Sequence, residues 1–407
     1  MALLLLEPLS ACLWVAFDYE YGNAFPTLNY YVGFETGFGG RKLIGTIAHL
    51  LFGNHIGVAQ IATMMMAAHV LMAGLFLWLV VRCLPRLDSR TLPVAAVLGI
   101  YLLSPFSLLK VMDGLRGISM GYMETYMVVA VLLWLVAFTY KRRGFWFYLL
   151  TAVVALFCCL VHHTFCCLLL PPMVALMIGE VVGERMDWRR AVAYVVSLLP
   201  TAAAFVGIVQ WGGMNTDVEN LMEQIRVRAG GNPQIALLQD QRVIEVLYYY
   251  SQWENRHWAF VEHELQRAMQ VGFELLLLAP IYVAMLWPWF RAARLGSTSA
   301  VRWRYWLMLA ADVLLTVPIY FMANDYGRWW SCFFFGLAAM SLVEWHSGRE
   351  EYRQALAEWW GWMKRHWWWA AVLVVYEAGL HLGGVSGLVE AIKLQKLVFS
   401  VLHISIG

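Results

Sequence analysis

The sequence predicts an all-α, polytopic integral membrane protein with about eleven transmembrane helices and a small helical extracytoplasmic subdomain. The composition is the first indication: of 407 residues, 61% are hydrophobic and only 14% are charged, and the mean hydropathy is +0.61. A soluble domain carries about 25% charged residues, so this chain has too few to cover a surface that faces water. Its formal net charge of +2 gives no indication of a nucleic-acid partner.

Apolar segments of suitable length are the second indication. A helix that spans the bilayer needs roughly 20 mainly apolar residues, and fewer where the bilayer thins around it. The segments that meet this requirement are 2–17, 56–81, 93–109, 125–140, 145–162, 165–183, 191–211, 271–290, 304–323, 329–345 and 367–383. The first of them lacks the basic start of a signal peptide, so we expect it to be a retained span.

The stretch 145–183 could form one long helix or two, and its flanks decide between them. Basic residues precede it at 141–143 and follow it at 185–190. Both flanks should be cytoplasmic, which requires an even number of crossings. We therefore expect a hairpin that turns at His162, His163 and Thr164, with Pro171 and Pro172 breaking or bending the returning helix.

The basic residues also predict the orientation. With the N-terminus in the cytoplasm, 17 of the 29 Lys and Arg residues fall on the cytoplasmic side, in short connections, as the positive-inside rule requires. The C-terminus is then extracytoplasmic, where residues 386–404 could lie as an amphipathic helix in the interface. A multi-pass protein of this size without organelle-targeting signals fits a bacterial plasma membrane.

The segment 212–270 is too long for a simple connection. We expect it to be an extracytoplasmic helical insertion in an otherwise single transmembrane domain, 1–407. The first predicted helix of this insertion ends near Arg228, before the Gly230-Gly231-Asn232-Pro233 sequence. Two further predicted helices run over about 234–250 and about 253–269.

Mixed charges, glycines and aromatic residues gather in the extracytoplasmic connections, which suggests binding or chemistry on that side. Asp18-Tyr19-Glu20 follows the first span. This pair is either a solvated start of a loop, or a site where the two carboxylates bind a divalent cation or where one acts as a general base. An acidic pair of this kind in the first extracytoplasmic loop resembles that of the type C (GT-C) glycosyltransferases.

Further along the first loop, Glu35-Thr36-Gly37-Phe38-Gly39-Gly40-Arg41-Lys42 combines three glycines with two cations. Glycines let the backbone approach a ligand, and adjacent Arg and Lys side chains can bind phosphate oxygens. The motif is either an anchor for a lipid headgroup or a specific pyrophosphate site, and the two share the same chemistry.

Acid, base and glycine recur in two other connections. Residues 110–117 contain Lys110, Asp113 and Arg116, and residues 324–330 contain Asp325 and Arg328. In the second, the alternatives are a functional carboxylate near the membrane surface and an Asp325–Arg328 ion pair that closes the turn.

Cysteine and histidine cluster at 158–167. Helical spacing would align Cys158, His162 and Cys166 as metal ligands, but the hairpin expected here separates the cysteine pairs. We therefore expect the seven cysteines to be core residues, and His162 or His163 to face an outer cavity.

The GT-C resemblance implies a glycosyltransferase that uses a sugar linked to polyprenyl phosphate or diphosphate, and Arg226 and Arg228 before Gly230-Gly231 resemble the arginine-bearing loops of O-antigen polymerases. It implies Asp18 as base or metal ligand, Glu20 as its assistant, and Mg²⁺ or Mn²⁺ as the candidate cofactor. Asp113 and Asp325 are rival acid–base candidates. Phosphate would be held by Arg41, Lys42, Lys110, Arg116 and Arg328, and the cavity lined by Glu35, His162, His163, Arg226 and Arg228.

The partners implied are membrane lipids, the polyprenyl-linked donor and a lipid-linked glycan acceptor, because the large C-terminal soluble domain and acceptor motifs of oligosaccharyl transferases are missing. Two alternatives stay open. A transporter or flippase for a lipid-linked or anionic substrate predicts ionisable residues in the middle of spans. A structural subunit of an envelope complex predicts that the candidate residues share no cavity.

Overall fold

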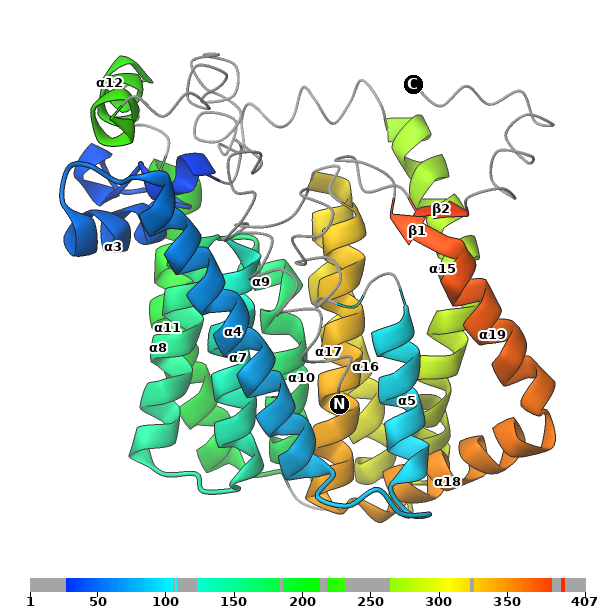
Figure 1. The fold of residues 1–407 in the computed structure, drawn as a ribbon. Coiled ribbons are helices and arrows are strands. Elements are labelled where there is room, and N and C mark those ends of the chain that lie inside the picture. The colour runs from blue at the N-terminus through cyan, green and yellow to red at the C-terminus, as the bar shows by residue number, and fades with distance from the viewer. Residues whose placement is uncertain are drawn as a thin grey trace. The chain divides into compact units, whose positions relative to one another are not determined.

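The computed structural model describes residues 27–104, 107, 123–183, 186–212, 218–230, 264–322, 326–382 and 389–391. These residues are helical apart from their connections and one short antiparallel pair of strands (Figure 1). The chain divides into two compact units. Unit 1 comprises 1–82, 112–173 and 187–263, and unit 2 comprises 83–111, 174–186 and 264–407.

Unit 1 is built around helices α7, α8 and α11, with smaller elements gathered at one end. In chain order its elements are η2 (Leu28–Tyr30), η3 (Phe34–Thr36), α3 (Leu43–Phe52), α4 (Val58–Cys83), α7 (Glu124–Thr139), α8 (Phe145–Val161), α9 (Phe165–Leu168), α11 (Trp188–Trp211) and α12 (Val218–Ala229). Helix α8 packs against both α7 and α11. Helices α3 and α12 lie at the upper end of this group in Figure 1.

Polar contacts inside unit 1 join its apolar helices. Trp134 Nε1 in α7 donates to Thr151 Oγ1 in α8 at 2.9 Å, in a buried position. Arg143, in the connection between these helices, lies over the rings of Phe138 and Phe147. The first contact satisfies a buried indole N–H, and the second places a guanidinium against two aromatic faces in a cation–π contact.

The predicted turn at His162–Thr164 is confirmed. Helix α8 ends at Val161 and α9 begins at Phe165, with a turn between them. A further break at Leu169 separates α9 from α10 (Leu170–Val181), as predicted for the returning helix. Pro171 and Pro172 occupy the first turn of α10, where a missing backbone N–H costs nothing, so the helix restarts there instead of continuing through them.

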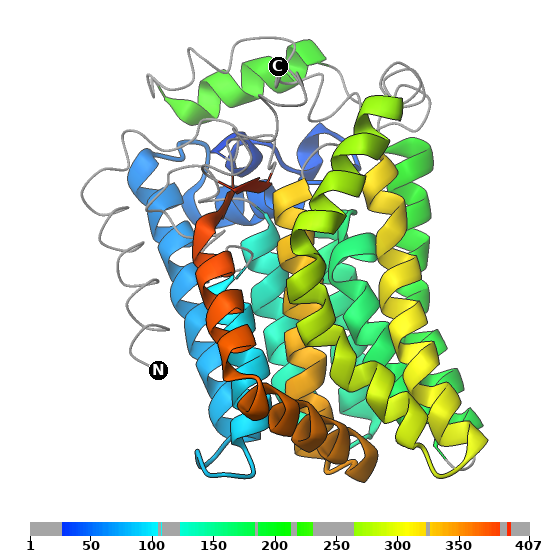
Figure 2. The same cartoon turned by 90° about the vertical axis from the view of Figure 1, so that its right-hand side faces the viewer.

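Unit 2 contains α5 (Leu92–Leu103), most of α10, α15 (Glu264–Leu295), α16 (Ser299–Met322), α17 (Tyr326–Ser347), α18 (Glu350–Arg365), α19 (Trp367–Gly379), β1 (Leu380–Leu382) and β2 (Val389–Ala391). Helix α15 packs against α16 and α18, and α17 packs against α5. Helix α18 crosses the lower end of this unit, and α19 rises from it (Figures 1 and 2). Tyr352 holds α18 in place, because its hydroxyl donates to Ser341 Oγ in α17 at 2.7 Å and its ring packs on Trp289 of α15.

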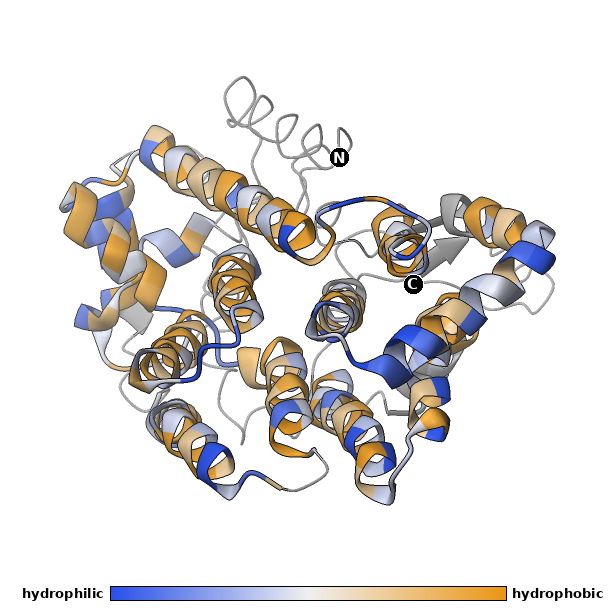
Figure 3. Ribbon diagram, turned by 90° about the horizontal axis from the view of Figure 1, so that it is seen from below, coloured by the Kyte–Doolittle hydropathy of each residue, from blue (hydrophilic) through white to orange (hydrophobic). Residues whose placement is uncertain are grey.

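Three of the described helices are long and apolar enough to cross a membrane, judged by length and composition: Val58–Cys83, Trp188–Trp211 and Leu275–Leu295. Only 28% of the most apolar window of α11 is buried, and its outward side chains include Val192, Val195 and Leu199. Apolar residues colour most of the helices, whereas hydrophilic residues occur in their connections and along α18 (Figure 3). Exposed apolar surface of this extent suits a membrane protein.

The predicted spans 93–109, 125–140, 145–162, 165–183 and 367–383 overlap shorter helices, and 2–17 lies outside the described residues. The predicted spans 304–323 and 329–345 overlap α16, of 24 residues, and α17, of 22 residues. Two boundaries differ from the prediction. Helix α15 begins at Glu264, so it continues from the predicted insertion into the next span without a break at 270. Val389–Ala391 forms β2 instead of the start of the interfacial helix at 386–404, because Leu380-His381-Leu382 and Val389-Glu390-Ala391 alternate in polarity as strands do.

Candidate functional site

Charged and histidine side chains from three separate segments of unit 1 gather at the end of α8 and α11. They come from the loop that precedes α3, from the turn between α8 and α9, and from the last turn of α12. We call these residues the cationic cluster: Glu35, Arg41, Lys42, His162, His163 and Arg228. Their proximity depends on the α8–α9 hairpin and on the short helices that cover this end of the unit.

The loop before α3 is folded by its own polar groups. Phe34 N–H donates to Thr46 Oγ1 at 2.8 Å, and Thr36 Oγ1 donates to Gly33 O at 2.8 Å. Lys42 then closes the loop, because its ammonium donates to Thr36 O at 3.2 Å and to Gly37 O at 3.0 Å. Lys42 therefore has a structural role as well as a charge.

Lys42 is a buried cation. It is 1% exposed, and burial lowers its pKa from 10.5 to about 8, although the nearby Glu35 carboxylate acts in the opposite direction. An ammonium has three N–H groups, and two of them are used by the loop carbonyls. Within the described segments the third N–H makes no hydrogen bond, which leaves one donor for an anion.

Arg41 is bound to the turn between α8 and α9. Its Nε donates to His162 Nε2 at 2.8 Å, and His162 Nδ1 lies 2.7 Å from Thr164 Oγ1. Nε2 is an acceptor, since a guanidinium is not deprotonated in a protein, and the backbone N of Thr164 also lies 3.2 Å from His162 Nδ1. The contact therefore requires a neutral His162, because a protonated ring has no lone pair to offer Arg41.

The backbone of Arg41 adopts a left-handed conformation, with φ at +66°. This region is uncommon for a residue with a side chain and costs of order 1 kcal/mol or more. Strain of this kind persists where the surroundings fix the conformation, here through the His162 contact and the helix that begins at Leu43. Its place directly before Lys42 makes this turn a candidate for function.

Two glycines allow the loop to lie against the helix ends. A Cβ atom on Gly40 would lie 2.7 Å from His163 Nδ1, and a Cβ atom on Gly39 would lie 2.9 Å from the carbonyl oxygen of Gly212. Neither position has room for a side chain unless the neighbouring groups move. The sequence analysis expects these glycines to let a ligand approach the backbone, and in the structure the groups that approach it are His163 and the end of α11.

Arg228 connects α12 to the first loop. Its Nη1 lies 2.5 Å from Glu35 Oε1 and donates to Tyr31 O at 2.8 Å, while its own carbonyl accepts from Ile56 N at 2.9 Å. The Arg228 side chain is buried, whereas Glu35 is about one-third exposed. Glu35 is therefore the solvent-facing member of the pair, and Arg228 is the member that faces the core.

The other predicted site residues are placed less fully. Arg226 lies on the exposed face of α12, where it pairs with Glu223 at 2.9 Å, so it is a surface ion pair and not part of the cluster. Arg328 belongs to the first turn of α17, and its side chain lies outside the described atoms. The remaining candidates, which lie outside the described residues, are Asp18, Glu20, Lys110, Asp113, Arg116 and Asp325.

A second polar group, in unit 2, was not expected from the sequence. Arg304 of α16 donates to Gly179 O and to Glu344 Oε1 of α17, each at 2.5 Å, and both charged side chains are almost fully buried. Arg304 belongs to the basic residues that the positive-inside rule explains by orientation alone. Glu344 carried a usable signal, since it is an acid in the last turns of an apolar helix with a base in the neighbouring one.

Asp312 stands in the middle of α16 and is 1% exposed. Neither of its carboxylate oxygens has a hydrogen-bond partner among the residues that the structure describes. A buried carboxyl group without partners is costly and is an indication of function in an apolar helix.

The described segments contain no group of three His, Cys, Asp or Glu side chains that could hold a metal ion. Glu35 is the one carboxylate of the cationic cluster, and a site at Asp18 and Glu20 lies outside the described residues. No family model, no curated protein and no solved structure matches this chain.

Proposed function

We propose that the protein is a membrane glycosyltransferase or polysaccharide polymerase that takes sugar from a polyprenyl-phosphate-linked or diphosphate-linked donor. The observation that supports this is the cationic cluster, where Arg41, Lys42 and Arg228 meet two histidines beside the ends of apolar helices. A lipid-linked donor needs cations for its phosphate next to an apolar path for its isoprenoid chain. The acceptor in this proposal is a lipid-linked glycan.

The proposal includes the finer topology. The chain would cross a bacterial plasma membrane about eleven times, with its N-terminus in the cytoplasm, its C-terminus outside and the cationic cluster at the extracytoplasmic face. The three long apolar helices and the exposed apolar side chains of α11 support a membrane location. The distribution of basic residues along the sequence supports the orientation.

In the proposed reaction, an acceptor hydroxyl oxygen forms a bond to the anomeric carbon of the donor sugar. The bond between that carbon and the phosphate oxygen breaks, and the polyprenyl phosphate leaves with the electron pair. The hydroxyl proton passes to a carboxylate, for which Asp18 is proposed, with Glu20 assisting and Asp113 and Asp325 as rivals. Lys42 and Arg41 stabilise the charge that grows on the leaving phosphate.

Phosphate recognition can be tested separately from sugar transfer. We expect the purified protein in detergent to bind polyprenyl phosphate and to bind polyprenol, which has the same chain without phosphate, at least tenfold more weakly. Lys42→Met should remove most of this difference, whereas Arg226→Gln, which removes an exposed charge of α12, should leave it unchanged. Equal binding of the two lipids by the unaltered protein would contradict the proposal.

Transfer itself is tested in liposomes that contain a panel of polyprenyl-linked sugars and a lipid-linked glycan acceptor. The expected result is a radiolabelled product with one donor, and its loss in Asp18→Asn. Full transfer by Asp18→Asn would exclude Asp18 as the base and would turn attention to Asp113 and Asp325.

A transporter or flippase is the second candidate, and Asp312 is the observation that favours it. A buried, unpartnered carboxyl group in the middle of a helix is typical of ion pathways. Transport predicts that Asp312→Asn abolishes translocation of a fluorescent polyprenyl-phosphate analogue across liposomes without reducing its binding. The glycosyltransferase proposal predicts sugar transfer by Asp312→Asn at an undiminished rate.

A further inference from the structure

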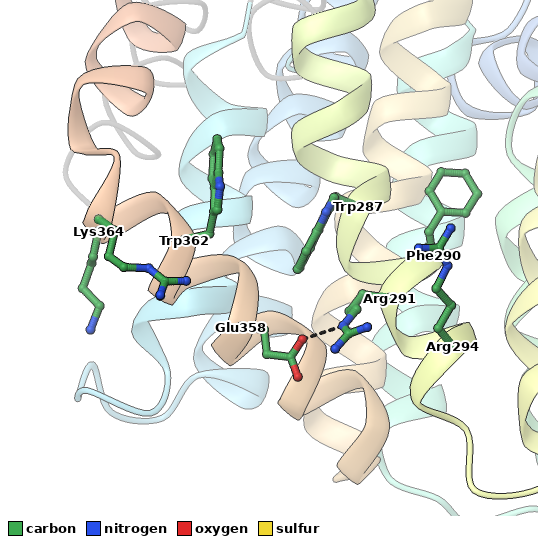
Figure 4. A pocket seen from close by; sticks show the side chains of 9 residues that line it. Trp287, Phe290, Arg291, Arg294, Glu358, Trp362 and Lys364 are labelled. Carbon is green, nitrogen blue, oxygen red and sulfur yellow. Dashed lines mark hydrogen bonds and ion pairs between the residues drawn. The ribbon is translucent and has the colours of Figure 1, made fainter.

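The lower end of unit 2 contains a cavity of about 1110 Å³ between the last turns of α15 and the last turns of α18. Its lining from α15 consists of Trp287, Phe290, Arg291 and Arg294, and its lining from α18 consists of Glu358, Gly361, Trp362, Lys364 and Arg365. Figure 4 shows Trp287 and Trp362 on facing sides of the space between the two helices, with the Arg291–Glu358 pair below them, whereas Lys364 lies at its α18 edge and Arg294 beside Phe290 at its α15 edge. The cavity belongs entirely to unit 2 and takes no part in the cationic cluster.

The charges around the cavity do not cancel. Four of the lining residues are basic and one is acidic. Arg291 Nε lies 2.5 Å from Glu358 Oε2, and this hydrogen bond lowers the pKa of Glu358. Three cations remain, and within the part of the chain that the structure describes they make no ion pair: Arg294, Lys364 and Arg365.

Three of the nine lining residues are aromatic: Trp287, Phe290 and Trp362. Phe290 is 40% exposed and Trp362 is 41% exposed, and both are far too apolar to favour water. Tryptophan with adjacent cations is typical of the level at which lipid headgroups meet acyl chains. The cavity thus presents apolar rings and basic side chains together, which matches a molecule with an anionic head and an apolar body.

Helix α18 has the form of an interfacial helix. Its buried residues are Tyr352, Ala355, Leu356, Trp359 and Met363, which recur at helical spacing on one face, while its other face is charged. It crosses the end of unit 2 instead of continuing along α17 or α19 (Figure 2). At its end the chain turns at His366 into three exposed tryptophans, Trp367, Trp368 and Trp369. Such a helix lies in the plane of the interface.

Gly361 keeps the cavity open. A Cβ atom at this position would meet nothing within 4 Å, so the space above it is unfilled. Glycine is unfavourable within a helix by roughly 0.5–1 kcal/mol relative to alanine. No close packing in unit 2 requires its small size.

We propose that the cavity between α15 and α18 binds an anionic membrane phospholipid, whose phosphate is attracted by the basic edges of the cavity, Arg294, Lys364 and Arg365, and whose upper acyl chain lies against Trp287 and Trp362. This inference rests on the membrane location of the chain and is independent of sugar transfer. It assigns these three cations a binding role in addition to their effect on orientation.

The test uses the full chain, purified and delipidated in a non-ionic detergent, with native mass spectrometry as the readout. Phosphatidylglycerol and phosphatidylcholine with identical acyl chains are titrated in parallel. We expect phosphatidylglycerol to bind more tightly, and Arg294→Gln/Lys364→Gln/Arg365→Gln to weaken it by roughly ten- to hundredfold. A matched control removes three exposed cations elsewhere, Arg86→Gln/Arg90→Gln/Arg142→Gln, and should keep the full preference.

A second variant protects the test against misfolding of the first. Gly361→Leu fills the open space without changing the charge and should weaken phosphatidylglycerol binding, whereas Gly361→Ala should weaken it far less. An unchanged lipid preference in Gly361→Leu, or an equal loss in the control triple variant, would overturn the proposal. Inorganic phosphate that binds as tightly as phosphatidylglycerol would overturn the lipid as the occupant. Sugar transfer, measured separately, is unaffected by either outcome.

Discussion

Arg228 joins α12 to the first loop through a single nitrogen, because its Nη1 lies 2.5 Å from Glu35 Oε1 and 2.8 Å from Tyr31 O. Glu35 in turn lies close enough to Lys42 to affect its pKa. A residue of the large connection after α11 therefore influences the charge of a residue at the start of α3. This link makes the cationic cluster one electrostatic unit instead of a set of independent surface charges.

Removing Arg228 should destabilise unit 1. Arg228→Met leaves Tyr31 O and the inner side of Glu35 without their donor, so we expect a loss of about 2 kcal/mol in the free energy of unfolding. Arg226→Met is the control two residues away, because its pair with Glu223 is exposed and worth at most about 1 kcal/mol. Thermal unfolding in detergent measures both. If Arg228→Met and Arg226→Met lost similar amounts of stability, burial would not strengthen the contribution of Arg228.

The charge of Lys42 should be visible in the pH dependence of anion binding. Its pKa is about 8 when folded and 10.5 when free, so the ammonium is charged in both states below pH 8. We expect affinity for polyprenyl phosphate to fall about tenfold between pH 7 and pH 9, as the folded protein loses this proton. Lys42→Arg, which stays charged, should bind equally at both pH values.

The same group predicts the opposite trend for stability. Between pH 8 and pH 10.5 the unfolded chain holds the proton of Lys42 and the folded chain does not, so the free energy of unfolding should rise with pH in this window. The comparison is between the unaltered protein and Lys42→Met, for which this contribution disappears. If the free energy of unfolding of the unaltered protein fell relative to that of Lys42→Met between pH 8 and pH 10.5, the burial of Lys42 would be contradicted.

Gly40 should not tolerate a side chain. In Gly40→Ala the new methyl group would meet His163 Nδ1 at 2.7 Å, so the loop must move away from the α8–α9 turn. We expect a loss of about 1–3 kcal/mol in stability and weaker phosphate binding. Gly99→Ala in α5 is the control, because no atom lies near its Cβ position, and it should be neutral or stabilising by up to about 1 kcal/mol.

The buried pair Arg304–Glu344 should respond differently to single and double substitution. Arg304→Met leaves a buried carboxylate without its partner and should cost about 3–5 kcal/mol. Arg304→Met/Glu344→Leu removes both charges and should recover most of this loss, although Gly179 O still loses its donor. The measurement is the melting temperature of the unaltered protein, of Arg304→Met and of Arg304→Met/Glu344→Leu. A double variant as unstable as the single variant would mean that the ion pair is not the main contribution.

Much of the helical pattern was readable from the sequence, because length and apolarity suffice to locate a helix that avoids water. The hairpin at His162–Thr164 followed from charge parity, and the restart of α10 at its prolines followed from the missing N–H. The amphipathic face of α18 was equally readable from Tyr352 to Met363. The prediction from the sequence does not include this helix, because the positive-inside rule already accounts for the basic residues of the connection.

The cationic cluster was predictable as a list of residues but not as an arrangement. Spacing alone marks Arg41 and Lys42 as candidate phosphate ligands, and it does not reveal that Lys42 is buried against the carbonyls of its own loop. Likewise, nothing in the local sequence distinguishes Arg228, which is buried, from Arg226, which is exposed two residues earlier in the same helix. Such differences depend on tertiary contacts between segments that are distant in sequence.

The left-handed backbone of Arg41 places stability and function in competition. Glycine or asparagine would relax this conformation, by about 1 kcal/mol, and would remove the guanidinium that reaches His162. Selection for thermal stability alone would therefore favour replacing Arg41, whereas selection for anion binding would retain it. Position 41 is thus a place where a library screened only for heat resistance should enrich inactive proteins.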